Sequence, residues 1–110
     1  MAFSKIVSPI PGLSVYDNEQ ISLVLAQFPE VSKAILFGSR AKGNFKKASD
    51  IDLSIKGQAL NNTIIAKINL ILNEETSLPY FFDVIHYESL KNIQLKEHID
   101  RVGIVIYTKI

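Results

Sequence analysis

The chain has 110 residues, 47% of them hydrophobic and 21% charged, and this ordinary globular composition predicts one folded domain and argues against disorder. Twelve Lys and Arg residues stand against eleven Asp and Glu residues. The resulting net charge of +1 excludes a polycationic protein that binds nucleic acid by itself over a wide surface. The absence of cysteine excludes disulfide scaffolds, cysteine nucleophiles and cysteine-based zinc sites.

The sequence shows no targeting or membrane segment. Its longest apolar runs hold about four residues, far below the roughly 20 that a membrane-spanning helix needs. The N-terminal residues lack the continuous apolar core of a signal peptide. We therefore expect a cytoplasmic protein with no membrane contact.

The N-terminal part divides into an arm and a helix. Residues 1–16 are expected to form an irregular arm with a short edge strand, because prolines and a glycine interrupt them. A helix is predicted to begin near Asp17, which can form a capping box with Gln20, and to end at Pro29. The single folded domain is expected to span residues 17–110.

Apolar spacing predicts the remaining elements. In chain order they are a strand at 31–37, a short helix in the polar stretch that follows, a strand at 50–55, a helix at 58–73, a strand at 79–87, a short helix at 88–100 and a strand at 102–107. The strand at 50–55 alternates, so that it has one apolar and one acidic face. This order predicts an α/β (α+β) fold with helices packed on a small mixed sheet.

Two aspartates lie on the acidic face of that strand. Asp50 and Asp52 are two residues apart, so both side chains point the same way and repel each other. Asp is depleted in strands. Divalent cations would remove the repulsion, because Mg²⁺ prefers carboxylate oxygens together with substrate phosphates. The pair indicates a metal site, and the alternative is a solvated strand face.

Two further features place polar groups beside strands. Gly38 and Ser39 follow a buried strand, where glycine permits close backbone approach to a phosphate and a helix start presents free N–H groups. The alternative is a plain turn with Ser39 as helix cap. Asp83 lies inside the apolar run FFDVI, so it is expected either to hold a metal or to face solvent on an edge strand.

The spacing joins these features into one pattern. Gly-Ser is followed by ten residues and then by Asp-x-Asp, which arises by chance in a chain of this length on the order of once in a thousand. The segment Leu36–Leu53, LFGSRAKGNFKKASDIDL, closely resembles the signature of the polymerase-β-like nucleotidyltransferases. Within that superfamily the chain looks most similar to the minimal nucleotidyltransferases (MNT), small antitoxin-type proteins paired with HEPN proteins. The resemblance covers roughly residues 20–107.

The resemblance implies a polymerase-β-like fold and a Mg²⁺-dependent reaction. A nucleoside monophosphate, AMP from ATP, would be transferred to a hydroxyl group of a partner protein, with two Mg²⁺ ions as cofactors. The implied site residues are the catalytic and metal-binding Asp50, Asp52 and Asp83 and the nucleotide-binding Gly38, Ser39 and Arg40.

The resemblance also implies a helical HEPN-type partner in a toxin–antitoxin pair. Two alternatives stay open. In the first, the chain is a non-catalytic module that neutralises its partner by contact. A surplus of apolar residues would suggest this, namely Ile104, Ile106 and Ile110 and the arm residues Ile6, Val7 and Ile10. In the second, it is the catalytic subunit for a nucleic acid or small molecule held by a partner subunit. The nucleotide base and the oligomeric state, including a homo-oligomer, also stay open.

Overall fold

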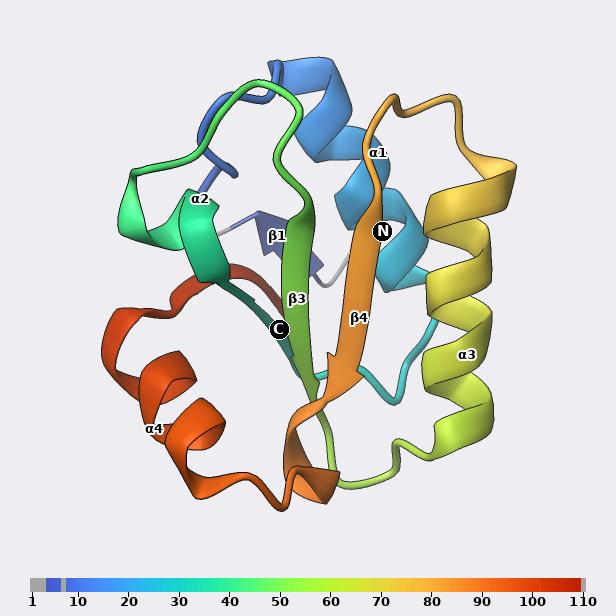
Figure 1. Ribbon diagram of the computed structural model, residues 1–110. Coiled ribbons are helices and arrows are strands. Elements are labelled where there is room, and N and C mark those ends of the chain that lie inside the picture. Colours follow the sequence, from blue (N-terminus) through green and yellow to red (C-terminus); the bar gives the residue numbers. More distant parts are fainter. Residues whose placement is uncertain (1–3, 7, 110) are drawn as a thin grey trace.

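The structure, a computed structural model, describes residues 4–6 and 8–109. They form a five-stranded sheet of order β1-β5-β2-β3-β4 with helices on both faces (Figure 1), which confirms the predicted α/β fold. The elements are, in chain order, β1 (Ser4–Ile6), α1 (Val15–Ala26), β2 (Lys33–Phe37), α2 (Gly38–Lys42), β3 (Ile51–Lys56), α3 (Asn62–Leu70), the π-helix η1 (Ile71–Glu75), β4 (Phe82–His86), the 3₁₀ helix η2 (Tyr87–Ser89), α4 (Ile93–Val102) and β5 (Ile104–Lys109).

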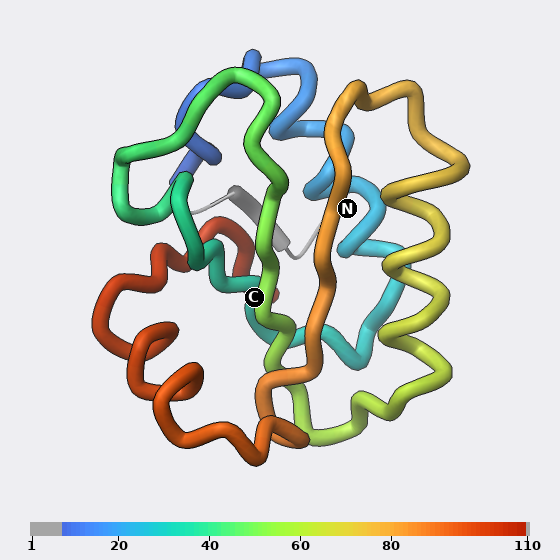
Figure 2. Tube along the Cα trace, in the orientation of Figure 1, coloured from blue at the N-terminus to red at the C-terminus, as the bar shows by residue number. Residues whose placement is uncertain are grey.

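The sheet is mixed. β1, β5, β2 and β3 pair with their neighbours in antiparallel fashion, whereas β3 and β4 are parallel and are joined through α3. A parallel pair needs such a crossover, and it makes both strands begin at the same end of the molecule, as Figure 2 shows. β1 is the edge strand that was expected in the N-terminal arm.

Two apolar layers hold the helices to the sheet. The main core packs α1 and α3 against the face of the sheet that carries Ile51, Leu53 and Ile55, as the alternation predicted. A smaller cluster packs α4 on the opposite face. Ile10 and Ile106 belong to the main core, being 1% and 3% exposed, and the half-buried Ile104 packs against it, so the prediction that these three form a surplus apolar surface is wrong. Val7, Ile110 and the side chain of Ile6 lie outside the described part of the chain.

Several element boundaries differ from those predicted. α1 begins at Val15 because the Ser14 hydroxyl, not Asp17, caps it: Ser14 Oγ accepts from Asp17 N at 3.1 Å. The Asp17 carboxylate instead accepts a hydrogen bond from the Tyr80 hydroxyl at 3.3 Å. The predicted helix at 58–73 starts later, at an Asn61 cap, and runs into a π-helix.

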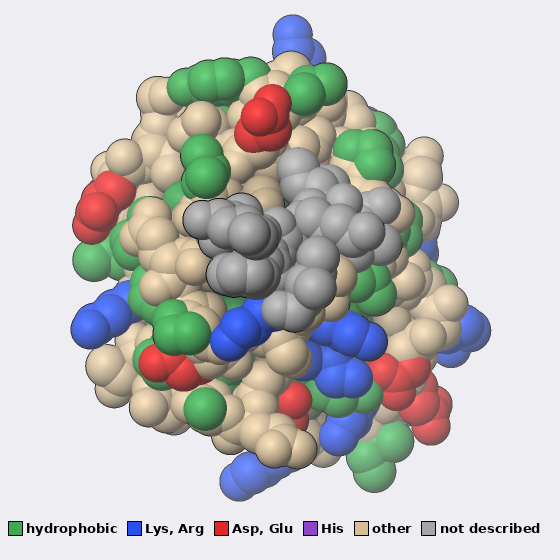
Figure 3. Space-filling model, turned by 180° about the vertical axis from the view of Figure 1, so that it is seen from behind, with side chains coloured by type: hydrophobic (Ala, Val, Ile, Leu, Met, Phe, Trp, Pro, Cys, Tyr) green, Lys and Arg blue, Asp and Glu red, His purple; other side chains and the backbone are tan. Residues whose placement is uncertain are grey.

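Charged side chains of both signs lie on the face of the molecule seen in Figure 3, in keeping with the net charge of +1. No helix in residues 4–6 and 8–109 is long and apolar enough to cross a bilayer.

Candidate active site

The turn between β2 and α2 brings the Gly-Ser motif against the Asp-x-Asp motif. Gly38 has φ = +76°, a conformation that favours glycine. A Cβ atom at this position would overlap the Oδ2 atom of Asp52. The Asp52 carboxylate therefore lies directly beside the Gly38 backbone, and a side chain at residue 38 would displace it. Ser39 follows on α2 and is half-buried.

The parallel pairing of β3 with β4 brings two carboxylates together. Asp52 and Asp83 are register partners on these adjacent strands, which lie about 4.8 Å apart in a typical sheet. The residues that flank each aspartate belong to the main core, so both carboxylates point to the opposite face, the one that carries α4. Asp83 is exposed there and Asp52 is half-buried.

Asp50 has a different position from the one predicted. It precedes β3, because Ile51 is the first residue of that strand to enter the ladder, with Ile51 N donating to Phe81 O at 2.9 Å. Asp50 is exposed at the end of the loop 43–50. Two of the three predicted carboxylates thus lie side by side, and the third stands at the entrance to the same strand.

Negatively charged side chains are concentrated at this site. Burial raises the pKa of Asp52 above its ordinary value of 3.8, and the negative charges of Asp83 and Asp50 raise it further. All three causes disfavour the ionised form of Asp52. A cation bound beside the carboxylate would favour that form and so oppose them.

The donor set fits Mg²⁺ in one respect. Among the described residues no group of three His, Asp or Glu side chains forms a ready metal-binding cluster. Mg²⁺ does not require such a cluster, because it keeps several water molecules and binds through one or two carboxylates plus substrate phosphates. The register pair Asp52 and Asp83 meets that lower requirement.

Arg40 is placed differently from the nucleotide contact predicted for it. Its side chain is 1% exposed, and its guanidinium donates to the carbonyls of Pro11 (2.9 Å), Lys47 (3.1 Å) and Ser49 (2.9 and 3.2 Å). These backbone oxygens take up most of its donors, so Arg40 is directed into the protein while the preceding Gly38 faces the carboxylates.

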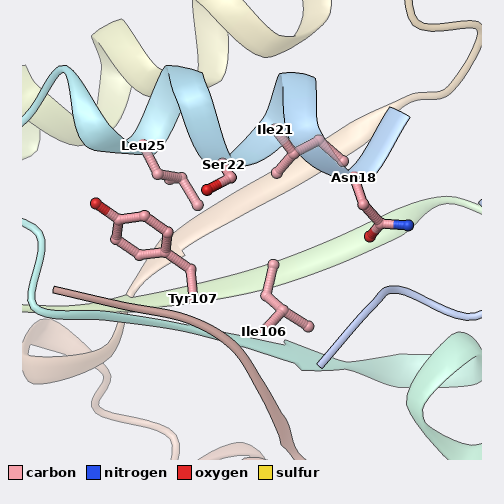
Figure 4. A pocket seen from close by; sticks show the side chains of 6 residues that line it. All are labelled: Asn18, Ile21, Ser22, Leu25, Ile106 and Tyr107. Carbon is pink, nitrogen blue, oxygen red and sulfur yellow. The ribbon is translucent and has the colours of Figure 1, made fainter. Parts of the chain in front are cut away.

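One small cavity lies away from the aspartates. The cavity in Figure 4 lies between α1 and β5, far from the aspartates in sequence, and measures about 10 Å³. It has room for one water molecule at most.

Sequence reasoning missed Asn73. This residue of the π-helix accepts from Phe82 N at 2.8 Å and donates to Phe82 O at 2.9 Å, and so holds the start of β4, next to Asp83. Its Nδ2 also donates to the Asn69 carbonyl at 3.0 Å and to Asn69 Oδ1 at 2.7 Å. The only signal in the sequence was a pair of Asn residues four apart within a predicted helix.

The chain belongs to the polymerase-β nucleotidyltransferase family. The family model described as "Polymerase beta, Nucleotidyltransferase" matches residues 19–109, which include the Gly-Ser motif and all three aspartates. A search of curated proteins found no match.

The more particular likeness is to solved toxin–antitoxin structures. A "toxin-antitoxin with AMP-PNP" has 22% sequence identity and a TM-score of 0.67 over 81% of this chain and 71% of that one. The "tri-AMPylated Shewanella oneidensis HEPN toxin in complex with MNT antitoxin" gives 20% identity, a TM-score of 0.61 and coverage of 82% and 68%. A "toxin-antitoxin MntA-HepT" structure gives 19% identity, a TM-score of 0.61 and coverage of 84% and 70%. These likenesses confirm the fold predicted from the signature.

Proposed function

We propose that this chain transfers AMP from ATP to a hydroxyl group of a partner protein. The observation that carries the proposal is the placement of Asp52 beside both Gly38 and Asp83, in a chain of the nucleotidyltransferase family. The turn at Gly38 and the pairing of β3 with β4 thereby bring together Gly38, Asp52 and Asp83. In the sequence, Gly38 and Asp52 are 14 residues apart, and Asp52 and Asp83 are 31 residues apart.

Each residue has a distinct role in this proposal. Gly38 and Ser39 bind the β- and γ-phosphates, and glycine is needed because a side chain there would push Asp52 away. Asp50, Asp52 and Asp83 would hold two Mg²⁺ ions, which when bound supply positive charge to the triphosphate. Asp83 is the exposed member of the register pair, so it is best placed to accept the proton of an incoming hydroxyl.

The reaction balances without a further reactant. The hydroxyl oxygen of the acceptor forms a bond to the α-phosphorus, and the bond from that phosphorus to the oxygen bridging to the β-phosphate breaks. The hydroxyl proton passes to Asp83, and pyrophosphate leaves with the electron pair of the broken bond. The need for ATP and Mg²⁺ agrees with the cytoplasmic location expected from the sequence.

We assign the acceptor to a HEPN-type toxin, with this chain as its antitoxin. The support is that similar structures are named as MNT antitoxins with HEPN toxins, one of them AMPylated.

Label transfer tests the reaction. The purified chain and Mg²⁺ are added to a separately purified HEPN-type partner. Each of the four α-labelled nucleoside triphosphates is then tested in turn. Asp52→Asn and Asp83→Asn test the site, and Glu97→Gln, an exposed carboxylate on α4, is the matched control. We expect label from ATP on the partner, lost in both aspartate variants and kept in the control. Transfer that survives both aspartate substitutions would refute the assigned site.

Neutralisation by contact alone is the second candidate. It is favoured by an open groove of about 350 Å³ along α3, where the apolar side chains of Leu70 and Phe81 are 53% and 60% exposed. The variants distinguish the two functions. If Asp52→Asn still protects cells from the partner at equal expression and no label is transferred by the wild-type chain, contact is the mechanism.

A further inference from the structure

Arg40 makes an unusual set of contacts for a cation. It is among the largest fully buried side chains of the protein. Within the described residues, no carboxylate lies within ion-pair distance of its guanidinium. The charge is satisfied instead by backbone carbonyls and by two aromatic rings, those of Phe45 at 4.9 Å and Tyr80 at 5.3 Å from Arg40 Cζ to the ring centroid.

Apart from the Pro11 carbonyl on the N-terminal arm, these contacts lie on the two segments that lead into the acid-bearing strands. Ser49, whose carbonyl accepts two of the hydrogen bonds, directly precedes Asp50 and the start of β3. Tyr80 comes three residues before Asp83 and leads into β4. Arg40 itself follows the Gly-Ser motif on α2. One side chain on α2 therefore contacts both segments that lead into the acid-bearing strands.

Arg40 supplies three hydrogen bonds to the loop that ends at Asp50. Within the loop, the Ser49 N–H donates to the Lys46 carbonyl (2.9 Å), and the Ser49 hydroxyl oxygen accepts from the Lys46 N–H (2.8 Å). The remaining hydrogen bonds that fix the carbonyls of Lys47 and Ser49 come from the guanidinium. Lysine could not replace it, because an ammonium lacks the planar fork that reaches several carbonyls at once.

Burying a cation without a carboxylate partner costs desolvation free energy. An apolar side chain of similar volume often stabilises a fold as well or better. The arrangement is better explained by the geometry that it imposes. We propose that Arg40 is the positioning residue of this site, which fixes Asp50 relative to Asp52 and Asp83 so that they can act together. This proposal rests on the proposed function and assigns Arg40 a role that does not require contact with the nucleotide.

The test compares Arg40→Lys with Lys67→Gln, an exposed helical cation far from Arg40 in the sequence. Mg²⁺·ATP binding is measured by calorimetry, and kcat and KM of AMP transfer are measured well below the melting temperature of each variant. We expect Arg40→Lys to lower kcat by about 10- to 100-fold and to weaken the dependence on Mg²⁺, since small displacements of catalytic groups have effects of this size. Lys67→Gln should match the wild type.

Phe45→Leu gives a second route if Arg40→Lys does not fold. It removes one aromatic ring from the guanidinium but leaves Arg40 in place, and Phe45 lies half-buried on the loop. A lowered kcat with native secondary structure supports the proposal. Unchanged kcat and Mg²⁺ dependence, within about twofold, in a folded variant would overturn it and leave Arg40 a structural residue. A wild-type chain that neither binds Mg²⁺·ATP nor transfers AMP would overturn the proposed function instead.

Discussion

Replacing Asp52 by asparagine should stabilise the protein when no metal is present. The asparagine keeps the shape of the side chain and removes one of the two negative charges that β3 and β4 bring together. At the spacing of adjacent strands in a typical sheet, about 4.8 Å, two carboxylates repel by about 1 kcal/mol at the dielectric constant of water and by more in a less polar surrounding. Because Asp52 is only half-buried, we use the lower figure. For a domain of this size, about 1 kcal/mol corresponds to a rise in Tm of about 4 °C.

The pH dependence has a definite sign. The pKa of Asp52 is raised in the folded state, so the folded protein takes up this proton at a higher pH than the unfolded chain does. The wild type therefore gains stability from this group as pH falls through the folded pKa, down to the ordinary value of 3.8. The advantage of Asp52→Asn should be largest near neutral pH and should disappear in acid.

Thermal melts in a metal-free buffer at several pH values test this reasoning, with Glu97→Gln as the matched carboxylate control. Added Mg²⁺ should raise the Tm of the wild type more than that of Asp52→Asn, because only the wild type retains both strand carboxylates. A lower Tm for Asp52→Asn at neutral pH without metal would refute the argument. It would mean that the carboxylate makes favourable contacts that outweigh the repulsion.

Three further substitutions follow from the packing. Gly38→Ala should cost about 2 kcal/mol in urea unfolding and abolish AMP transfer, because it strains a positive φ and displaces the Asp52 carboxylate. Asn73→Leu should cost about 2 kcal/mol in the same assay, because the N–H and carbonyl of Phe82 lose their partners. Ser54→Ala should leave the unfolding free energy unchanged or raise it by about 1 kcal/mol, because the buried Ser54 hydroxyl has no partner among the described residues.

Much of the fold could be predicted from short-range patterns of apolar and polar residues in the sequence. The strand at 31–37 and the alternation at 50–55 follow from where apolar residues stand, because burial dominates the free energy of such segments. The Gly-Ser and Asp-x-Asp motifs were also visible, because their spacing is local. The joint position of Asp52 and Asp83 was expected from the family resemblance, since no local pattern encodes the register of a parallel pair.

The parts that sequence reasoning missed are long-range polar contacts. Arg40 stands in a run of cations and resembles a solvent-exposed or phosphate-binding residue, yet it is buried by the carbonyls of a loop and an arm that are nine and 29 residues away in the chain. Asp17 looked like a helix cap because Tyr80, its hydrogen-bond donor, lies 63 residues downstream. Such partners become visible only when the tertiary structure is known.

The two hydrogen bonds between Asn73 and the Phe82 backbone affect how other chains can bind to this protein. β4 is an edge strand of the sheet, and edge strands with free peptide groups invite association with foreign strands. At Phe82 both peptide groups are already occupied by the Asn73 amide. A foreign strand could therefore not pair with β4 at Phe82, next to Asp83, and a partner would meet side chains at that point.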